Sequence, residues 1–314
     1  MLRWSAGAVA IAVAVLVAFV LLAPLGMRPN AAHPPLTQTP ADYGLRYDAV
    51  TFAPPDRPIT LRGWWMPVAN ARAAVILVHG GGDDNRSQPF QNGLALARDL
   101  AARGFGVLAF DLRNYGESDT TPEGVTFGDL EAYDVVGAVD LLARIAPGLP
   151  VVGLGCSMGG ATLVQAAARD ARLRVLVTDS VFADAWDVAP SFVRASSNLP
   201  ELLVGPVLWS AAHVHGVGLD RGNTIDAARR VTPRPVLLIH NEADPIAAPT
   251  ESWTLASVMP RSETWITPAP PVDHPLRWQN GRWGTHCQSY KLDPDGYVTQ
   301  VTAFLTRGLA PPTR

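Results

Sequence analysis

Short runs of apolar residues recur along most of the chain, separated by longer segments whose apolar residues follow helical spacing. Runs of this length, bounded by glycine, proline or polar residues, are typical of buried strands. The runs that predict such strands are residues 73–78, 106–110, 151–156, 173–178 and 235–240, and residues 262–267 predict a final strand. The segments that predict helices are residues 89–103, 129–145, 161–169 and 295–305. This alternation predicts an α/β fold with a mostly parallel sheet and helices on both faces.

Two stretches depart from this alternation. Residues 46–52 and 59–66 predict a pair of antiparallel strands, because a proline-rich turn separates them. Residues 182–223 are rich in Trp, Phe, His, Pro and Leu, and we interpret them as a helical cap inserted over the functional site. His213 and His215 in this cap lack a nearby third metal ligand, so we expect them to be surface or packing residues.

The N-terminus carries a long apolar segment between Arg3 and Arg28, and residues 6–23 are almost wholly apolar. At ~1.5 Å per residue this segment is long enough to cross a ~30 Å hydrocarbon core. We therefore predict a membrane anchor over residues 1–28, with a cleaved signal peptide as the alternative. Arg3 favours a cytoplasmic N-terminus and an exported catalytic domain. A proline-rich linker over 29–42 would then lead into one large domain over 43–310.

Composition narrows the classes of function. The 314 residues carry a net charge of −3, with 48% hydrophobic and 17% charged residues, so no basic surface for nucleic acid is indicated. The two cysteines, Cys156 and Cys287, form no metal-binding pattern, and two cysteines do not make a disulfide scaffold. Both adjoin residues that we single out below. Whether the two cysteines form a disulfide stays an open question, because the geometry that the bond needs cannot be read from the sequence.

A Gly-x-Ser-x-Gly motif centred on Ser157 joins the strand at 151–156 to the following helix. This is the context of a nucleophile elbow, a turn so tight that side chains on either side of the serine would clash. Gly155 and Gly159 would relieve that crowding. The serine hydroxyl would then stand at a helix N-terminus, where free N–H groups favour negative charge. The motif predicts a nucleophilic serine, although a glycine-rich turn is the simpler alternative.

An acid and a base follow later strands. Asp244 lies in the loop after the strand at 235–240, and His286 lies between the last strand and the closing helix. Parallel strands present their carboxyl ends at one edge of a sheet, so we expect Ser157, Asp244 and His286 to converge there. Two alternatives remain, namely His274 as the base and Asp179 as the acid.

Two other loops leave strands at the same edge. His79-Gly80-Gly81-Gly82 follows the strand at 73–78, and its glycines would let the backbone approach a ligand. We interpret His79 as a residue that orients this loop. The loop after residues 106–110 contains Asp111 and Arg113, for which we predict a salt bridge.

With these motifs the chain resembles the α/β-hydrolase superfamily, and most closely its membrane-anchored bacterial serine hydrolases. The serine, aspartate and histidine occur in the order expected of that superfamily. The resemblance covers roughly residues 43 to 307. The motifs that carry it are Gly63-Trp64-Trp65-Met66-Pro67, Val78-His79-Gly80-Gly81-Gly82, Asp111-x-Arg113-x-x-Gly116-x-Ser118-Asp119, Gly155-x-Ser157-x-Gly159, Ala243-Asp244-Pro245, and His286 ahead of Tyr297-Val298-x-x-Val301-x-x-Phe304-Leu305.

The resemblance implies a serine hydrolase that cleaves a carboxylic ester through an acyl-enzyme intermediate. Ser157 would be the nucleophile, His286 the base and Asp244 the acid that orients it. The backbone N–H groups of Met158 and Gly81 would form the oxyanion hole. The resemblance implies no metal or organic cofactor. The anchor and apolar cap favour a small acyl substrate of lipid-like character. Amide, peptide and thioester bonds remain alternatives, as does a catalytically silent, membrane-tethered binding protein of the same fold.

Overall fold

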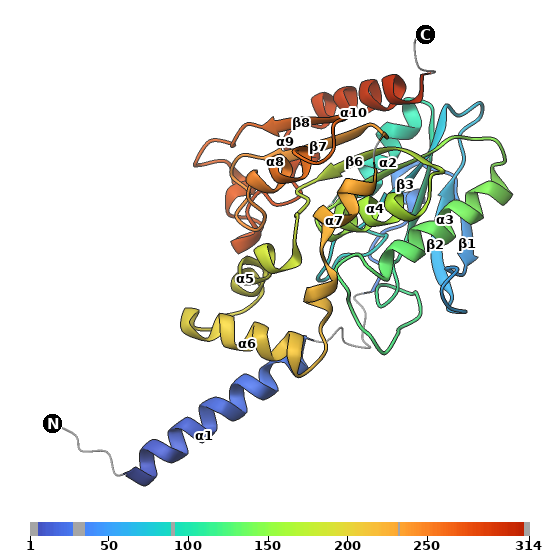
Figure 1. Ribbon diagram of the computed structural model, residues 1–314. Helices are drawn as coiled ribbons and strands as arrows, with labels where there is room; N and C mark the ends of the chain where they lie inside the picture. The colour runs from blue at the N-terminus through green and yellow to red at the C-terminus, as the bar shows by residue number, and fades with distance from the viewer. Residues whose placement is uncertain (1–5, 28–34, 89–91, 232, 311–314) are drawn as a thin grey trace.

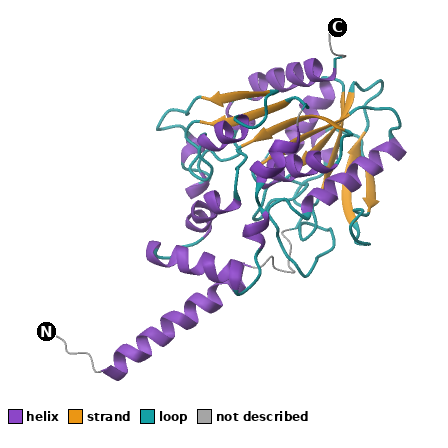
Figure 2. Cartoon of the chain, viewed as in Figure 1, coloured by secondary structure: helices purple, strands orange, loops and turns teal. Residues whose placement is uncertain are grey.

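A computed structural model describes residues 6–27, 35–88, 92–231 and 233–310 of the chain. Its centre is an eight-stranded sheet with the strand order β1-β2-β4-β3-β5-β6-β7-β8 (Figures 1 and 2). The strands are β1 (Asp48–Phe52), β2 (Leu61–Met66), β3 (Ala73–Val78), β4 (Phe105–Phe110), β5 (Val151–Cys156), β6 (Leu173–Asp179), β7 (Val236–Asn241) and β8 (Ser262–Thr267). Strand β2 pairs antiparallel with β1 and with β4, and the other pairs are parallel. The predicted mostly parallel α/β sheet is therefore confirmed.

Helices cover both faces of the sheet. One face packs against α2 (Gly93–Ala102), α9 (Ser289–Leu292) and α10 (Pro294–Leu309). The other packs against α3 (Glu131–Ile145), α4 (Met158–Arg169), α7 (Thr224–Val231) and α8 (Thr250–Ala256). Successive side chains of a strand point to opposite faces, so Ile76 and Val78 enter one apolar core and Val75 and Leu77 the other. Burial on both faces explains why these strands read as continuous apolar runs.

The predicted cap region contains two helices, α5 (Ala185–Ser196) and α6 (Glu201–His213), and the short 3-10 helix η4 (Gly218–Arg221). These elements lie away from the sheet, between β6 and β7 in the chain (Figure 1). An isolated β-bridge between Asp184 and Asn223 joins the two ends of the segment. The segment thus leaves the sheet and returns to it through paired backbone.

Helix α1 (Ala6–Leu22) continues into the 3-10 helix η1 (Ala23–Met27) and projects from the body toward the lower left of Figure 1. Residues Gly7–Leu25 have a mean hydropathy of 2.9 and are long and apolar enough to cross a membrane, a test that a signal sequence also passes. The inner end of α1 packs against α6, where His215 Nε2 lies 2.6 Å from the carbonyl oxygen of Leu21. Residues 28–34, which include the first six residues of the predicted linker, lie outside the described residues. The 3-10 helix Pro40–Tyr43 packs against α2.

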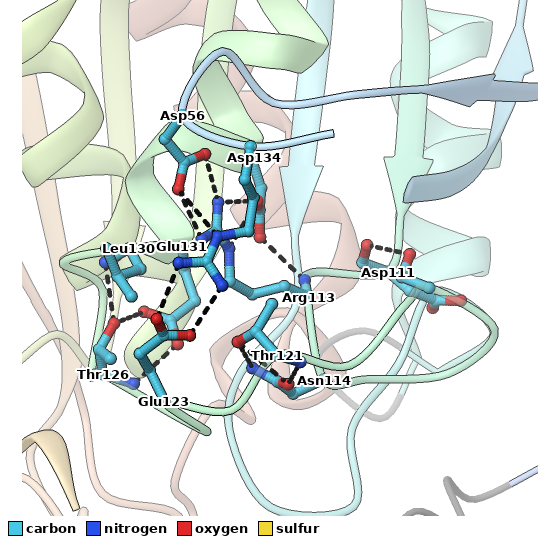
Figure 3. A network of polar contacts seen from close by, with 12 residues as sticks. Asp56, Asp111, Arg113, Asn114, Thr121, Glu123, Thr126, Leu130, Glu131 and Asp134 are labelled. Atoms are coloured by element: carbon cyan, nitrogen blue, oxygen red, sulfur yellow. Dashed lines mark hydrogen bonds and ion pairs between the residues drawn. The ribbon is translucent and has the colours of Figure 1, made fainter. Parts of the chain in front are cut away.

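The predicted salt bridge between Asp111 and Arg113 is wrong. The Arg113 guanidinium instead lies between Asp134 of α3, at 2.7 Å, and Asp56, at 2.8 Å (Figure 3). Asp111 pairs with Arg86 and accepts hydrogen bonds from the backbone N–H groups of Arg86 and Glu117. The two side chains leave the loop in different directions, because each has a partner from another segment that the local sequence does not reveal.

We expect Arg113→Ala to lower the free energy of unfolding by about 3–5 kcal/mol, because it strands the fully buried Asp134 carboxylate without its partner. Urea denaturation followed by circular dichroism measures this change. Arg307→Ala is the matched control, since its pair with Glu263 is about half exposed and contributes little. Equal losses in the two variants would contradict a structural role for the buried pair.

Candidate active site

Ser157 occupies a strained turn between β5 and α4. Its backbone adopts φ 50° and ψ −120°, a conformation that costs a residue other than glycine about 1–3 kcal/mol. The neighbouring glycines make the turn possible. A Cβ atom at Gly155 would lie 2.6 Å from the Gly159 backbone, and one at Gly159 would collide with the carbonyl groups of Val78 and His79. The Ser157 N–H donates to the Asp179 carbonyl oxygen at 2.8 Å, which ties the turn to β6.

His286 and Asp244 come together at the carboxyl edge of the sheet. Nδ1 of His286 lies 2.8 Å from Oδ2 and 3.0 Å from Oδ1 of Asp244, and both residues are buried. The Asp244 carboxylate also accepts the backbone N–H groups of Ile246 and Ala247. Burial by itself would raise the pKa of Asp244, but the nearby His286 ring and these donors hold that pKa below its ordinary value. The acid is therefore ionised at neutral pH and fixes the orientation of the imidazole.

A second histidine, which the sequence analysis did not single out, supports the Asp244 loop. His240, at the end of β7, is fully buried and lies between Ser252 Oγ and the Ala247 carbonyl oxygen, each at 2.8 Å. Burial lowers the pKa of His240, so this ring is neutral at neutral pH. The ring joins β7 to the loop that carries Asp244, and its Nε2 lies 3.6 Å from Asp244 Oδ2. No local sequence signal distinguishes it from any other residue at a strand end.

Ser157 and His286 lie on segments that are tied to each other. The Cys287 N–H donates to Ser180 Oγ at 3.1 Å, and a disulfide joins Cys156 to Cys287. In the described part of the chain the Ser157 hydroxyl makes no hydrogen bond with His286. Such catalytic contacts are often long before a substrate binds. The assignment of Ser157, His286 and Asp244 as a triad stays a prediction.

The glycine-rich loop after β3 lies beside the turn at Ser157. A Cβ atom at Gly80 would lie 3.8 Å from Cβ of Ser157, and one at Gly81 would lie 3.6 Å from Sδ of Met158. Met158 is the first residue of α4, so its N–H lies among those without an intrahelical acceptor. This proximity is what an oxyanion hole made of the Met158 and Gly81 N–H groups requires, and that assignment also stays a prediction.

His79 holds this loop in place. Its Nδ1 lies 2.7 Å from the Gly80 carbonyl oxygen, and its Nε2 accepts the Leu112 N–H at 3.1 Å. Burial lowers the pKa of His79, so the ring is neutral and its Nδ1–H is the donor to Gly80. The interpretation of His79 as the residue that orients the loop is confirmed.

Aromatic residues from the cap and from the histidine loop border the site. The ring of Phe192, in α5, comes within 3.8 Å of the position of a Cβ at Gly82. It meets the Trp283 ring edge to face at 5.3 Å, and the Trp283 ring lies 6.1 Å from that of His286. Arg282 binds the carbonyl oxygens of Arg194 and Ser197, so the cap and the histidine loop are joined. Phe192 and Trp283 therefore place an apolar surface beside His286.

The two alternative site residues occupy other surroundings. His274 caps the short helix Pro275–Arg277, and its Nδ1 accepts the Leu276 N–H at 3.2 Å. Asp179 is fully buried and accepts the hydroxyl groups of Ser180 and Ser289, both at 3.1 Å, rather than the His286 ring. Neither alternative contacts the His286–Asp244 pair through a hydrogen bond in the described part of the chain.

The two cap histidines serve packing contacts. The His213 ring stacks on Trp209 at 5.2 Å, and His215 meets the end of α1. Among the described residues, no group of three His, Cys, Asp or Glu side chains is arranged to hold a metal ion.

Comparison with known proteins adds independent information. A family model described as the α/β hydrolase fold matches residues 73–201. The uncharacterised protein YfhR of Salmonella typhi is 29% identical in an alignment of 227 positions that covers 66% of this chain and 66% of that protein's length. The monoglyceride lipase of Homo sapiens is 31% identical in an alignment of 153 positions that covers 46% of this chain and 48% of the lipase.

Solved structures agree with the family match. An esterase of Pyrococcus furiosus superimposes with a TM-score of 0.68 at 23% identity, covering 87% of this chain and 95% of the esterase. An esterase from Thermogutta terrifontis superimposes with a TM-score of 0.58 at 21% identity, covering 84% of this chain and 100% of the esterase. At these identities the likeness concerns the fold, and the expected fold class is confirmed.

The buried acid at the end of β6 predicts a pH dependence of stability. Burial raises the pKa of Asp179 to about 7, while Asp244, His286 and Tyr297 lie near it. Its unfolded pKa is about 4, so the folded protein binds this proton more tightly. Proton binding by Asp179 stabilises the folded state fully below pH ~4, and this stabilisation is lost as the pH rises to about 7. Relative to Asp179→Asn, wild type should therefore lose stability over this interval, as measured by urea denaturation at several pH values. A difference that does not change with pH would contradict the shifted pKa.

Proposed function

Because the chain belongs to the α/β-hydrolase superfamily, we propose that it is a serine hydrolase that cleaves a carboxylic ester through an acyl-enzyme intermediate. The observation that carries the proposal is the pair of contacts from His286 Nδ1 to the Asp244 carboxylate, at 2.8 and 3.0 Å. With Nδ1 bound to the acid, Nε2 is the ring nitrogen left to take a proton. The strained turn that carries Ser157 ends at the same edge of the sheet.

In the first step the Ser157 hydroxyl attacks the ester carbonyl while His286 Nε2 accepts its proton. Asp244 holds the imidazole in the required tautomer and stabilises the imidazolium as it forms. The new oxyanion accepts hydrogen bonds from the Met158 and Gly81 N–H groups. One such donor typically stabilises the transition state by about 3–4 kcal/mol. His286 then gives its proton to the leaving alcohol, and a water molecule, activated by the same ring, releases the acid.

A lipid-like acyl group is the substrate that the surroundings favour. Phe192 and Trp283 offer an apolar wall next to His286. The cap helix α6 exposes Leu202 and Trp209, by 75% and 55%, and packs against the inner end of α1. Exposed apolar side chains beside an apolar helix suit a membrane surface. The kinship with a protein named monoglyceride lipase supports the same substrate class.

We also propose that α1 anchors the protein and that the catalytic domain faces away from the cytoplasm. The length and hydropathy of the span Gly7–Leu25 support the anchor. Arg3, ahead of the span, supports a cytoplasmic N-terminus. The Cys156–Cys287 disulfide supports an oxidising compartment for the domain, since such bonds are rare in the cytoplasm.

We expect Ser157→Ala to lower kcat for a p-nitrophenyl ester by about 10⁴–10⁶-fold, because the covalent step is lost. Thermal denaturation should show that the variant folds. Labelling of the full chain by a fluorophosphonate probe should disappear with the same substitution. The exposed Ser257→Ala is the matched control and should keep both turnover and labelling. A wild-type protein that is neither labelled at Ser157 nor able to turn over esters would instead favour a silent binding protein.

Phe192→Ala should reduce kcat/KM for long-chain esters by about 10-fold or more and leave acetate esters nearly unchanged. Burying an aromatic side chain against an acyl chain contributes about 1.5–3 kcal/mol, which short esters cannot use. Rates across a series of acyl lengths measure the effect. Trp253→Ala, an exposed aromatic of α8 outside the cap, is the control. A uniform loss at every chain length would contradict an acyl-binding role for Phe192.

A further inference from the structure

The chain's two cysteines bracket the two residues that must exchange a proton. Cys156 immediately precedes Ser157, and Cys287 immediately follows His286. Their disulfide joins positions 131 residues apart in sequence, with the Cα atoms 6.0 Å apart. Both cysteines are buried, with exposures of 1% for Cys156 and 8% for Cys287, in the apolar core between the sheet and α10. The bond therefore connects the strand that carries the nucleophile directly to the loop that carries the base.

The loop that carries His286 has little regular structure of its own. Between β8 and α9 it contains two 3-10 helices of three residues each, Pro275–Arg277 and Gly281–Trp283. Cys287 adopts φ 57°, a left-handed conformation that is unfavourable for a residue with a side chain. The backbone conformation of Cys287 therefore depends on contacts with the surrounding structure, because residues with a side chain rarely adopt it on their own.

The polar contacts of this loop run to segments that neighbour the nucleophile strand. The Cys287 N–H donates to Ser180 Oγ, just after β6, and His286 Nδ1 lies 2.8 Å from the Asp244 carboxylate, in the loop after β7. The buried atoms Oγ1 of Thr285 and Oε1 of Gln288 have no hydrogen-bond partner in the described chain. A covalent link at Cys287 is the strongest connection of this segment to β5.

We propose that the Cys156–Cys287 disulfide is a positioning device, which holds His286 at the distance and angle from Ser157 that proton transfer requires. The inference rests on the proposed function. A misplacement of about 1 Å at a catalytic group can cost about 10²-fold in rate. Loss of the bond therefore lowers turnover even when the protein stays folded. Because reducing thiols break the bond, the activity of the wild-type protein is sensitive to them.

The redox step is a thiol–disulfide exchange. A dithiol such as dithiothreitol gives two electrons, the Cys156–Cys287 bond breaks into two thiols, and the reagent closes to its cyclic disulfide. In an oxidising compartment the bond persists, and in a reducing one it is lost. The same exchange, run backwards by a small-molecule disulfide, restores the bond.

The first measurement counts thiols in the full-length protein after denaturation. Because the chain has two cysteines, we expect no free thiol without reductant and two after reduction. Two free thiols in protein purified from an oxidising compartment would overturn the inference.

The second measurement compares Cys156→Ala, Cys287→Ala and the double variant in ester hydrolysis. We expect each to lower kcat by about 10- to 100-fold while KM changes by less than about 3-fold. The double variant should be no worse than either single variant, because one bond is lost in all three. Reduction of wild type should lower kcat by the same factor, reoxidation should restore it, and the double variant should not respond.

Val301→Ala controls for stability, since it removes buried side-chain atoms from the same apolar core without touching the site. It should lower Tm but leave kcat unchanged. If the cysteine variants likewise lose Tm but keep kcat, the disulfide only stabilises the fold and the positioning role is refuted. Effects of the two single variants that add in the double variant would also refute it. A wild type with no free thiol but no ester turnover refutes the proposed function, and the inference with it.

Discussion

The close approach of the turn at Ser157 to strand β3 is the constraint on which the candidate site depends. Gly159 lies so near the carbonyl groups of Val78 and His79 that no side chain fits between them. This approach brings the backbone of the glycine-rich loop beside Ser157 and Met158. One steric requirement thus sets the turn at Ser157 beside the glycine-rich loop, whose Gly81 N–H we propose as an oxyanion-hole donor. The strain in the turn is maintained by the surrounding core, because β5 is buried on both faces.

Much of the fold follows from local patterns in the sequence. The six parallel strands β3 to β8 fall within a residue of the predicted ranges, and the five that are buried, β3 to β7, do so because burial on both faces requires continuous apolar runs. The long helices α3 and α10 follow from their periodicity. Helices α7 and α8 were not predicted, since eight and seven residues give too few turns for a period to emerge. Local patterns therefore predict long elements better than short ones.

The candidate site divides in the same way. Ser157 stands out through a motif of five consecutive residues, and the pairing of His286 with Asp244 follows from where parallel strands end. The pairing of Arg113 with Asp56 and Asp134 depends on contacts between distant segments, which no short window of sequence contains. The Cys156–Cys287 bond belongs to this second kind: its two ends are visible in the sequence, but their distance is a property of the folded chain.

The bridge between Asp184 and Asn223 has a consequence for how proteins of this kind diversify. Since the inserted segment begins and ends at one point, its length and shape can change without altering the spacing of β6 and β7. The sheet and its turns can then be inherited unchanged while the helices above them are exchanged. Selectivity toward substrates can evolve in one module, and the chemistry can be conserved in another.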